Sequence, residues 1–342
     1  MGEERSVHSL PPFGKDMRTC WVIDHPAHFQ LFRQWFCDDD ILVVTKRQEL
    51  DIMLEVGFEQ PILRVNRVMG GWFRKISLAR QREGAVRRFL NNHPVTRIVS
   101  KGAPFELRAA AKQKVPERWY LTDTEVNTIA HRLGAKVATH ILLPESWEGV
   151  LKPTQTYPGI LPMAYIDSST SLEAWNSAKG QIVEELSLPK TDLVVFHRKI
   201  TGDGIHDCSE VINYDTSIRK MDVHFVENKE STAVADGSAW DFPLHAALFD
   251  GVLTGSTTLA AEAVVQGVPT LLISKANRGF LTYLENQPHF FHWNDSDLFD
   301  GRFAKMAAEW KLSMHSARSA GRNPLDDVGT SEVLNTLFGQ PF

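Results

Sequence analysis

Residues 250–273 constrain the fold of this chain more than any other stretch. An apolar run at 251–254 leads into a turn of Gly, Ser and Thr, a short helical segment, a Gly–Pro break and a second apolar run. This order predicts a βαβ unit with parallel strands. The turn places backbone N–H groups and hydroxyls at the start of a helix, where an anion is favoured.

A carboxylate follows this turn at a helical spacing. Glu262 comes four residues after Thr258, so the two side chains share one face of the helix. A phosphate at the turn and a carboxylate one turn further along suit a nucleotide, with the diphosphate first and the ribose hydroxyls next. The pattern leaves open an ordinary strand–loop–helix capped by Ser or Thr.

Apolar runs and helical stretches alternate along the whole chain. We predict strands at 19–23, 41–45, 62–65, 97–100, 118–122, 140–143, 193–196, 223–226, 251–254 and 270–274. Helices are predicted at 29–37, 48–55, 70–91, 104–114 and 128–133, with one or two closing helices at 303–338. Because 342 residues exceed one ordinary domain, the expected fold is α/β, with two Rossmann-like domains of mainly parallel sheets facing across a cleft. The domains are placed at 1–160 and 161–342, with the crossover at 152–162.

Polar groups follow several predicted strands at the carboxyl ends, where such sheets bind ligands. His28 follows the strand at 19–23 and can serve as a general acid or base near neutral pH. The alternative is that His28 caps or packs the next helix while Asp24 closes the turn. Asp123 and Glu125 follow the strand at 118–122 and can activate a hydroxyl or bind a sugar, although a helix-capping pair explains them equally well.

His197 and Arg198 end the first strand of the second half. Arginine forks onto phosphate oxygens and keeps its proton, so Arg198 is a candidate phosphate ligand, with His197 as a neighbour. A solvated basic loop is the alternative.

The segment 250–273 resembles the donor-binding element of GT-B glycosyltransferases and of UDP-N-acetylglucosamine 2-epimerases. In those families a Gly/Ser-rich turn holds the diphosphate and the glutamate of the following helix binds the ribose. The resemblance implies that the donor site consists of His197, Arg198, Gly255, Ser256, Thr257, Thr258 and Glu262.

Most of the chain is similar to the domain-of-unknown-function 354 family, which is itself GT-B-like. The matching pieces occur in order at 21–32, 100–108, 122–125, 157–160, 254–262 and 280–285. The resemblance implies the GT-B fold and a nucleotide-linked ligand, without a bound metal or a tightly bound cofactor.

Residues 61–114 are strongly basic. They hold 13 Lys or Arg against two acids, a net charge of +11 in a chain whose net charge is −5. With Trp72 and Phe73 ahead of a predicted amphipathic helix, the stretch suits an anionic membrane surface or an anionic acceptor, such as a lipid-linked group or a polyanionic saccharide. A nucleic acid fits less well, and a solvated helix face remains the plain alternative.

Composition narrows the class of protein further. Cys20, Cys37 and Cys208 have no metal-ligand spacing, which favours reduced thiols in a cytoplasmic protein. No apolar run approaches the length of a membrane span, so attachment through the basic stretch would be peripheral. The histidines show no HxxxH or HExxH grouping, and we predict no metal site.

The sequence therefore predicts a glycosyltransferase that moves a sugar from a nucleotide-diphosphate donor, of UDP type, to an unidentified acceptor on the first domain. His28, Asp123 and Glu125 are the candidate catalytic residues. Two alternatives stay open: a nucleotide-sugar 2-epimerase, and a non-catalytic nucleotide-sugar-binding protein. The nucleotide base, sugar, acceptor, stereochemistry and oligomeric state are not specified by these patterns.

Overall fold

The computed structural model describes residues 18–47, 50–51, 54, 59–68, 71–178, 184, 187, 192–199, 212, 221–229, 242–295, 297 and 301–341. Most of the predicted helix at 48–55, and Cys208, lie outside the described residues. Of the other two cysteines, Cys20 is a buried free thiol and Cys37 an exposed one. No helix among the described residues is long and apolar enough to cross a membrane.

The first half of the chain contains seven strands among its described residues. Its elements are β1 (Thr19–Ile23), α1 (Pro26–Phe32), the 3₁₀ turn η1 (Arg33–Trp35), β2 (Ile41–Thr45), β3 (Ile62–Val65), α3 (Trp72–Asn92), β4 (Arg97–Lys101), α4 (Pro104–Lys112), β5 (Glu117–Leu121), α5 (Thr128–Ala135), β6 (His140–Pro144) and β7 (Gln155–Tyr157).

The second half contains five strands among its described residues. Its elements are η2 (Leu161–Ala164), α6 (Ser168–Ala178), β8 (Val194–Lys199), β9 (His224–Lys229), α10 (Phe242–Ala246), β10 (Gly251–Thr254), α11 (Thr257–Val265), β11 (Thr270–Ile273), α12 (Gly279–Glu285), β12 (Phe290–Trp293), α13 (Gly301–Ala320) and α14 (Thr330–Phe338).

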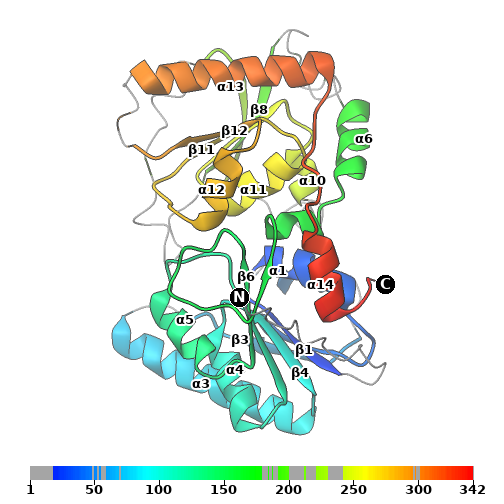
Figure 1. Cartoon of the computed structure of the whole chain (residues 1–342), viewed down its shortest axis with the longest axis vertical. Coiled ribbons are helices and arrows are strands. Elements are labelled where there is room, and N and C mark those ends of the chain that lie inside the picture. The colour runs from blue at the N-terminus through cyan, green and yellow to red at the C-terminus, as the bar shows by residue number, and fades with distance from the viewer. Residues whose placement is uncertain are drawn as a thin grey trace, which may run out of the picture.

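The strands form two separate sheets, one in each half of the molecule (Figure 1). The first has the order β3-β2-β1-β4-β5-β6-β7 and the second the order β12-β11-β10-β8-β9. Every pairing in both sheets is parallel. The parallel pairings, with helices between most of the strands, confirm the predicted α/β class with mainly parallel sheets.

All ten predicted strands are present, with ends shifted by no more than three residues. Two edge strands, β7 and β12, were not predicted, because β7 has only three residues, two of them polar, and His292 interrupts the apolar run of β12. Since β7 belongs to the first sheet, the chain crosses between the sheets only after Tyr157, later than the start of the predicted crossover at 152–162.

Several predicted helices have different ends, and for two of them the local cause is clear. Helix α1 starts at Pro26, three residues early, because proline suits the first helical position and His25 caps the turn. Helix α4 ends at Lys112 rather than Lys114, which adopts a left-handed backbone conformation with φ of 57°.

Both faces of each sheet are buried, as parallel sheets require. In the first half, α3 and α4 lie over one face (Figure 1), and Val86 and Leu107 pack into its core. On the other face, α1 and the C-terminal helix α14 lie together, where Phe338 packs against Trp21 and Trp119. The last helix of the chain therefore completes the core of the first half.

Candidate functional site

The turn after β10 is organised by its own side chains. The Oγ1 atom of Thr254 accepts a hydrogen bond from the Ser256 amide at 2.9 Å, and Ser256 caps α11 by accepting from the Leu259 amide at 3.4 Å. Gly255 is buried between them, and Thr257 and Thr258 open the helix half-buried. The first amides of a helix have no partners within the helix, so the turn combines a Ser cap with a place for an anion.

Glu262 lies on α11, one helical turn after Thr258, and is 5% exposed. Its Oε1 atom accepts a 2.7 Å hydrogen bond from the hydroxyl of Tyr165. Burial raises the pKa of Glu262 to about 7, against the opposing effects of the Tyr165 hydrogen bond and the charges of Arg198 and Lys101. A substantial fraction of this carboxyl is therefore protonated at neutral pH. Tyr165 was not predicted, because it lies outside every motif and is 97 residues from Glu262 along the chain.

Arg198 and His197 are adjacent on β8 and point to opposite faces of the sheet. Arg198 is half-buried, donates to Oδ1 of Asn228 on β9, and lies close enough to Glu262 to lower its pKa. His197 is fully buried, with its ring 5.7 Å from that of Phe225. The structure thus brings Arg198 beside Thr254 and Glu262, whereas the side chain of His197 packs beside Phe225.

His28 lies in the first turn of α1, and its ring is 6.0 Å from that of His25. The Nδ1 atom of His25 accepts from the Ala27 amide at 3.2 Å, so His25 is the helix cap rather than His28. The Nδ1 atom of His28 is buried and has no hydrogen-bond partner among the described residues. Burial, followed by the charge of Lys101, lowers the pKa of His28 well below its ordinary value. The imidazole is therefore neutral at pH 7 and can accept a hydrogen bond or a proton.

Asp24 belongs to a buried ionic group rather than to the candidate catalytic set. Its Oδ1 atom accepts from the hydroxyl of Thr45 and from Arg82, whose guanidinium also binds Glu106. Burial by itself would raise the pKa of Asp24, but Arg82 and Thr45 outweigh it and the pKa is lowered. These contacts tie the end of β1 to β2, α3 and α4, and they are made with distant residues rather than within the turn that Asp24 was predicted to close.

Asp123 forms an ion pair with Lys101 at 2.9 Å, between the ends of the neighbouring strands β5 and β4. Lys101 also lowers the pKa values of both His28 and Glu262, so its charge acts on groups from both halves. Lys101 was not singled out from the sequence. The signal that could have found it is a basic residue at the carboxyl end of a central strand.

Glu125 and its neighbour Thr124 contact the second half of the chain. Oε1 of Glu125 accepts from the amides of Gly279, at 3.1 Å, and Glu148, at 3.3 Å. Its Oε2 atom is buried without a hydrogen-bond partner among the described residues. Thr124 accepts from the guanidinium of Arg278. The alternative of a helix-capping pair at Asp123 and Glu125 is wrong, because α5 begins at Thr128 with Asn127 as its cap.

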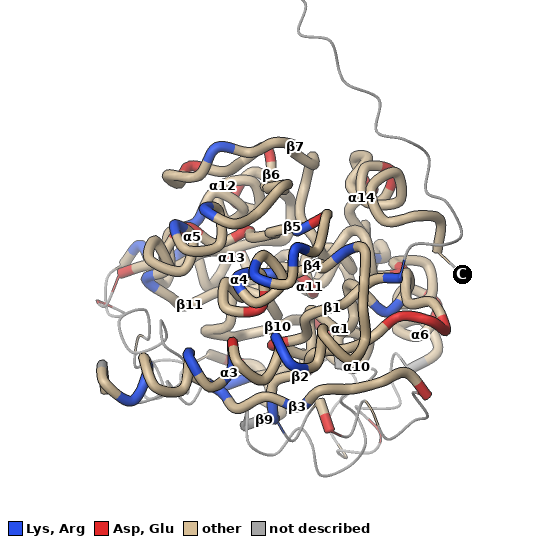
Figure 2. The backbone as a smooth tube through the Cα atoms, turned by 90° about the horizontal axis from the view of Figure 1, so that it is seen from below, with Lys and Arg blue, Asp and Glu red and all other residues tan. Residues whose placement is uncertain are grey.

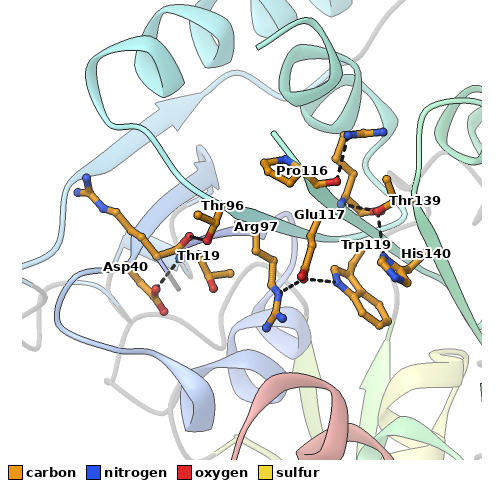
Figure 3. Close-up of polar contacts among 11 residues, drawn as sticks. Thr19, Asp40, Thr96, Arg97, Pro116, Glu117, Trp119, Thr139 and His140 are labelled. Carbon is orange, nitrogen blue, oxygen red and sulfur yellow. Dashed lines mark hydrogen bonds and ion pairs between the residues drawn. The ribbon is translucent and has the colours of Figure 1, made fainter. Parts of the chain in front are cut away.

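The basic stretch 61–114 contributes cations to the interior as well as to the surface. Lys and Arg occur along α3 and α4 (Figure 2), and both acids of the stretch are paired within it, Glu83 with Arg108 and Lys112, and Glu106 with Arg82. Arg82 is 7% exposed. Arg97 is bound by Glu117 at 2.8 Å, in the network with Trp119 that Figure 3 shows. The prediction that this stretch faces solvent or a membrane is therefore wrong for Arg82 and Arg97, because the fold buries both residues.

The described residues contain no group of three or more His, Cys, Asp or Glu side chains able to hold a metal ion. Instead, the charges of Lys101 at the end of β4 and of Arg198 on β8 act on Glu262 of α11, and the charge of Lys101 also acts on His28 of α1.

Solved structures share this two-sheet arrangement. The S. aureus MnaA–UDP co-structure matches with a TM-score of 0.65 and 13% identity, over 94% of this chain and 96% of that one. A putative UDP-N-acetylglucosamine 2-epimerase from Listeria monocytogenes matches with a TM-score of 0.61 and 12% identity, over 94% and 95%. MurG from Acinetobacter baumannii matches with a TM-score of 0.52 and 10% identity, over 94% and 99%.

No protein-family model and no curated protein sequence matches the chain, so the similarity to the domain-of-unknown-function 354 family stays a prediction. At these identities the structural matches establish the fold alone, and they do so over nearly the full length of each chain. The chain therefore has the GT-B fold, with two parallel α/β sheets.

Proposed function

We propose that this chain is a GT-B-type glycosyltransferase that transfers a sugar from a UDP-linked donor to an acceptor hydroxyl. The donor binds the second half, 161–342, and the acceptor binds the first half, 1–160. The observation that carries the proposal is the buried Glu262 one turn below a Ser-capped helix start, with the charges of Arg198 and Lys101 beside it. Two structural matches support it, because one is a co-structure with UDP and the other is a putative UDP-N-acetylglucosamine 2-epimerase.

In this proposal the diphosphate occupies the turn at residues 255–258, and Arg198 neutralises part of its charge. The ribose hydroxyls then replace the Tyr165 hydroxyl on Glu262. Fixed donors and cations placed where negative charge develops stabilise the departing diphosphate without reorganisation.

The proposed proton acceptors belong to the first half of the chain, and Lys101 acts on both of them. The acceptor hydroxyl gives its proton to the unpartnered Nδ1 atom of His28, or to Asp123 beside Lys101. Its oxygen forms a bond to the anomeric carbon while the bond from that carbon to the diphosphate oxygen breaks. The neutral state of His28 at pH 7 leaves its nitrogen lone pair available for this step.

A 2-epimerase is the second candidate. Asp123 lies on the 122–125 loop, which reaches the second half through Thr124 and Glu125, so acidic groups are near the donor site without any acceptor. Such an enzyme needs acid and base groups but no second substrate.

The test is incubation of the protein with UDP-N-acetylglucosamine alone, after a thermal-shift screen of nucleotides and nucleotide sugars. A transferase hydrolyses the compound slowly and turns over faster when an acceptor is added, whereas an epimerase converts it to its 2-epimer. A protein that no nucleotide or nucleotide sugar stabilises against heat would contradict both candidates, because a ligand at 100 times its Kd adds about 2.7 kcal/mol.

A further inference from the structure

Arg278 joins the two halves of the molecule at the candidate site. Arg278 is the residue directly before α12 in the second half, and it is 8% exposed. Its Nε atom donates to Oγ1 of Thr124 in the first half at 2.8 Å. Its Nη1 atom donates to Oγ1 of Thr257, the first residue of α11, at 3.0 Å. One guanidinium therefore contacts both the loop that carries Asp123 and the turn proposed to hold the diphosphate.

The backbone of Gly279, the residue after Arg278, packs directly against the first half. The amide of Gly279 donates to Oε1 of Glu125, which also accepts from the Glu148 amide. A Cβ atom at Gly279 would lie 1.8 Å from the carbonyl oxygen of Ser146, so no larger residue fits without displacement of the chain. The start of α12 thus packs on the first half at backbone distance. Thr124 and Glu125 of the first half are thus in contact with Arg278 and Gly279 of the second half.

We propose that Arg278 is a positioning residue, which couples occupancy of the Thr257 turn by the donor diphosphate to placement of the 122–125 loop. This inference rests on the proposed donor site. A phosphate at the turn gives the guanidinium a charge-assisted partner, which is stronger than the neutral hydroxyl of Thr257. The bond from Nε to Thr124 then holds the loop with Asp123 and Glu125 at the donor.

The chemistry of arginine suits this role. A guanidinium is planar and presents donors in a fixed fork, so it can hold two acceptors on different segments at once. A lysine ammonium keeps the charge but not the fork. Arg278→Lys therefore retains attraction for phosphate and loses the simultaneous contact with Thr124.

Thr124→Val separates coupling from donor binding. The substitution keeps the shape of the side chain and removes the acceptor for Nε, while the contact between Arg278 and Thr257 stays. Thr96→Val is the matched control, because the Thr96 hydroxyl bonds the Arg18 carbonyl at the opposite, amino-terminal edge of the first sheet (Figure 3).

Three quantities are measured: UDP affinity by calorimetry, hydrogen exchange at the amides of Gly279 and Glu148 with and without UDP, and kcat and KM with UDP-N-acetylglucosamine. In the wild type and in Thr96→Val, UDP slows exchange at both amides. In Thr124→Val, UDP affinity stays within twofold, the UDP-dependent slowing falls at least tenfold, and kcat falls at least tenfold with KM for the donor unchanged. Arg278→Lys loses the slowing and also binds UDP several-fold more weakly.

The outcomes separate the coupling from the donor site on which it rests. Wild-type protein that does not bind UDP overturns both the proposed function and the coupling. Wild-type protein that binds UDP with no change in exchange at Gly279 and Glu148 overturns the coupling alone, as does a Thr124→Val variant whose exchange and kcat match those of Thr96→Val.

Discussion

The hydroxyl of Tyr165 donates a 2.7 Å hydrogen bond to Oε1 of Glu262. This contact fills the position on the carboxylate that a ribose hydroxyl would take in the proposed donor complex. Tyr165 follows η2, which connects the two halves, so the same contact links the donor helix to the crossing segment. Binding of a nucleotide would exchange one hydroxyl for another on a buried carboxyl group, which keeps that group satisfied throughout.

The first prediction concerns Glu262→Ala. The change removes the hydrogen bonds that the ribose hydroxyls donate to the charged carboxylate, worth roughly 1.5–3 kcal/mol each, so donor affinity should fall at least tenfold. Calorimetry with UDP measures the affinity, and circular dichroism checks the fold. Tyr165→Phe is the control, since it removes the competing hydroxyl but keeps the carboxylate, and it should not weaken binding. Equal UDP affinity for Glu262→Ala and the wild type would remove Glu262 from the site.

The second prediction concerns pH, because the pKa of Glu262 is raised to about 7 from 4.5. The groups that act on it are Tyr165, Arg198 and Lys101. If the ionised carboxylate binds the ribose, UDP affinity should rise roughly tenfold between pH 6 and pH 8, as the ionised fraction rises. Glu262→Gln should lose this pH dependence, whereas a slope that survives in Glu262→Gln would assign it to another group.

The same shift predicts the opposite trend for the stability of the unliganded protein. The folded state binds more protons at Glu262 than the unfolded state between pH 4.5 and pH 7, so this group lowers the free energy of unfolding as pH rises through that window. Urea unfolding of the wild type and of Glu262→Gln at pH 5 and pH 8 measures it. The stability difference between the two proteins should change in favour of Glu262→Gln at pH 8, and an unchanged difference would contradict the shift.

The third prediction concerns His28→Ala. Loss of a general base should lower kcat by about 10²–10⁴ while UDP affinity persists, because His28 is on the acceptor side. His25→Ala is a contrasting variant, since it removes a helix cap and should chiefly lower stability, by about 1 kcal/mol. A His28→Ala protein with normal turnover would move the role to Asp123 or remove it from this loop.

The fourth prediction concerns Arg82→Ala. The buried guanidinium binds both Asp24 and Glu106, so its removal leaves two carboxylates without their cation. Breaking a buried pair in this way costs about 3–5 kcal/mol, measurable as a loss in the free energy of unfolding by urea. Arg80→Ala, which changes an exposed residue two positions away, should have little effect. A loss below about 1 kcal/mol for Arg82→Ala would contradict the buried ionic group.

The fifth prediction concerns the exposed part of the basic stretch. Phe73 is 87% exposed beside Arg74, and Arg80 and Arg87 are also exposed on α3. If this face docks on anionic lipid, the protein should bind phosphatidylserine vesicles at low salt and dissociate as salt rises. Replacing Arg74, Arg80 and Arg87 by Gln removes about 3 kcal/mol of attraction, at about 1 kcal/mol each, and should abolish binding without changing UDP affinity. Wild-type protein that ignores such vesicles and polyanions at low salt would leave α3 as a solvated face.

The strands and most of the helices could be predicted because their signals are local. The buried run at 41–45 and the strand, turn and helix at 250–273 are properties of consecutive residues. The rule that parallel sheets bind ligands at the carboxyl ends of their strands then pointed to Arg198 and Asp123, and the helical spacing after Thr258 pointed to Glu262. Composition and periodicity were enough for the two-sheet α/β class.

The sequence by itself thus determined the elements and the edges where a site could form, whereas the tertiary structure decided which side chains meet there. Tyr165 bonds Glu262 across 97 positions and Arg278 bonds Thr124 across 154. Helix α14 packs into the core of the first half, and Arg82, although it belongs to the basic stretch, is buried in an ionic group with Glu106. Periodicity specifies which face of an element is apolar, but partners so distant along the chain are brought together only when the sheets and their crossovers pack.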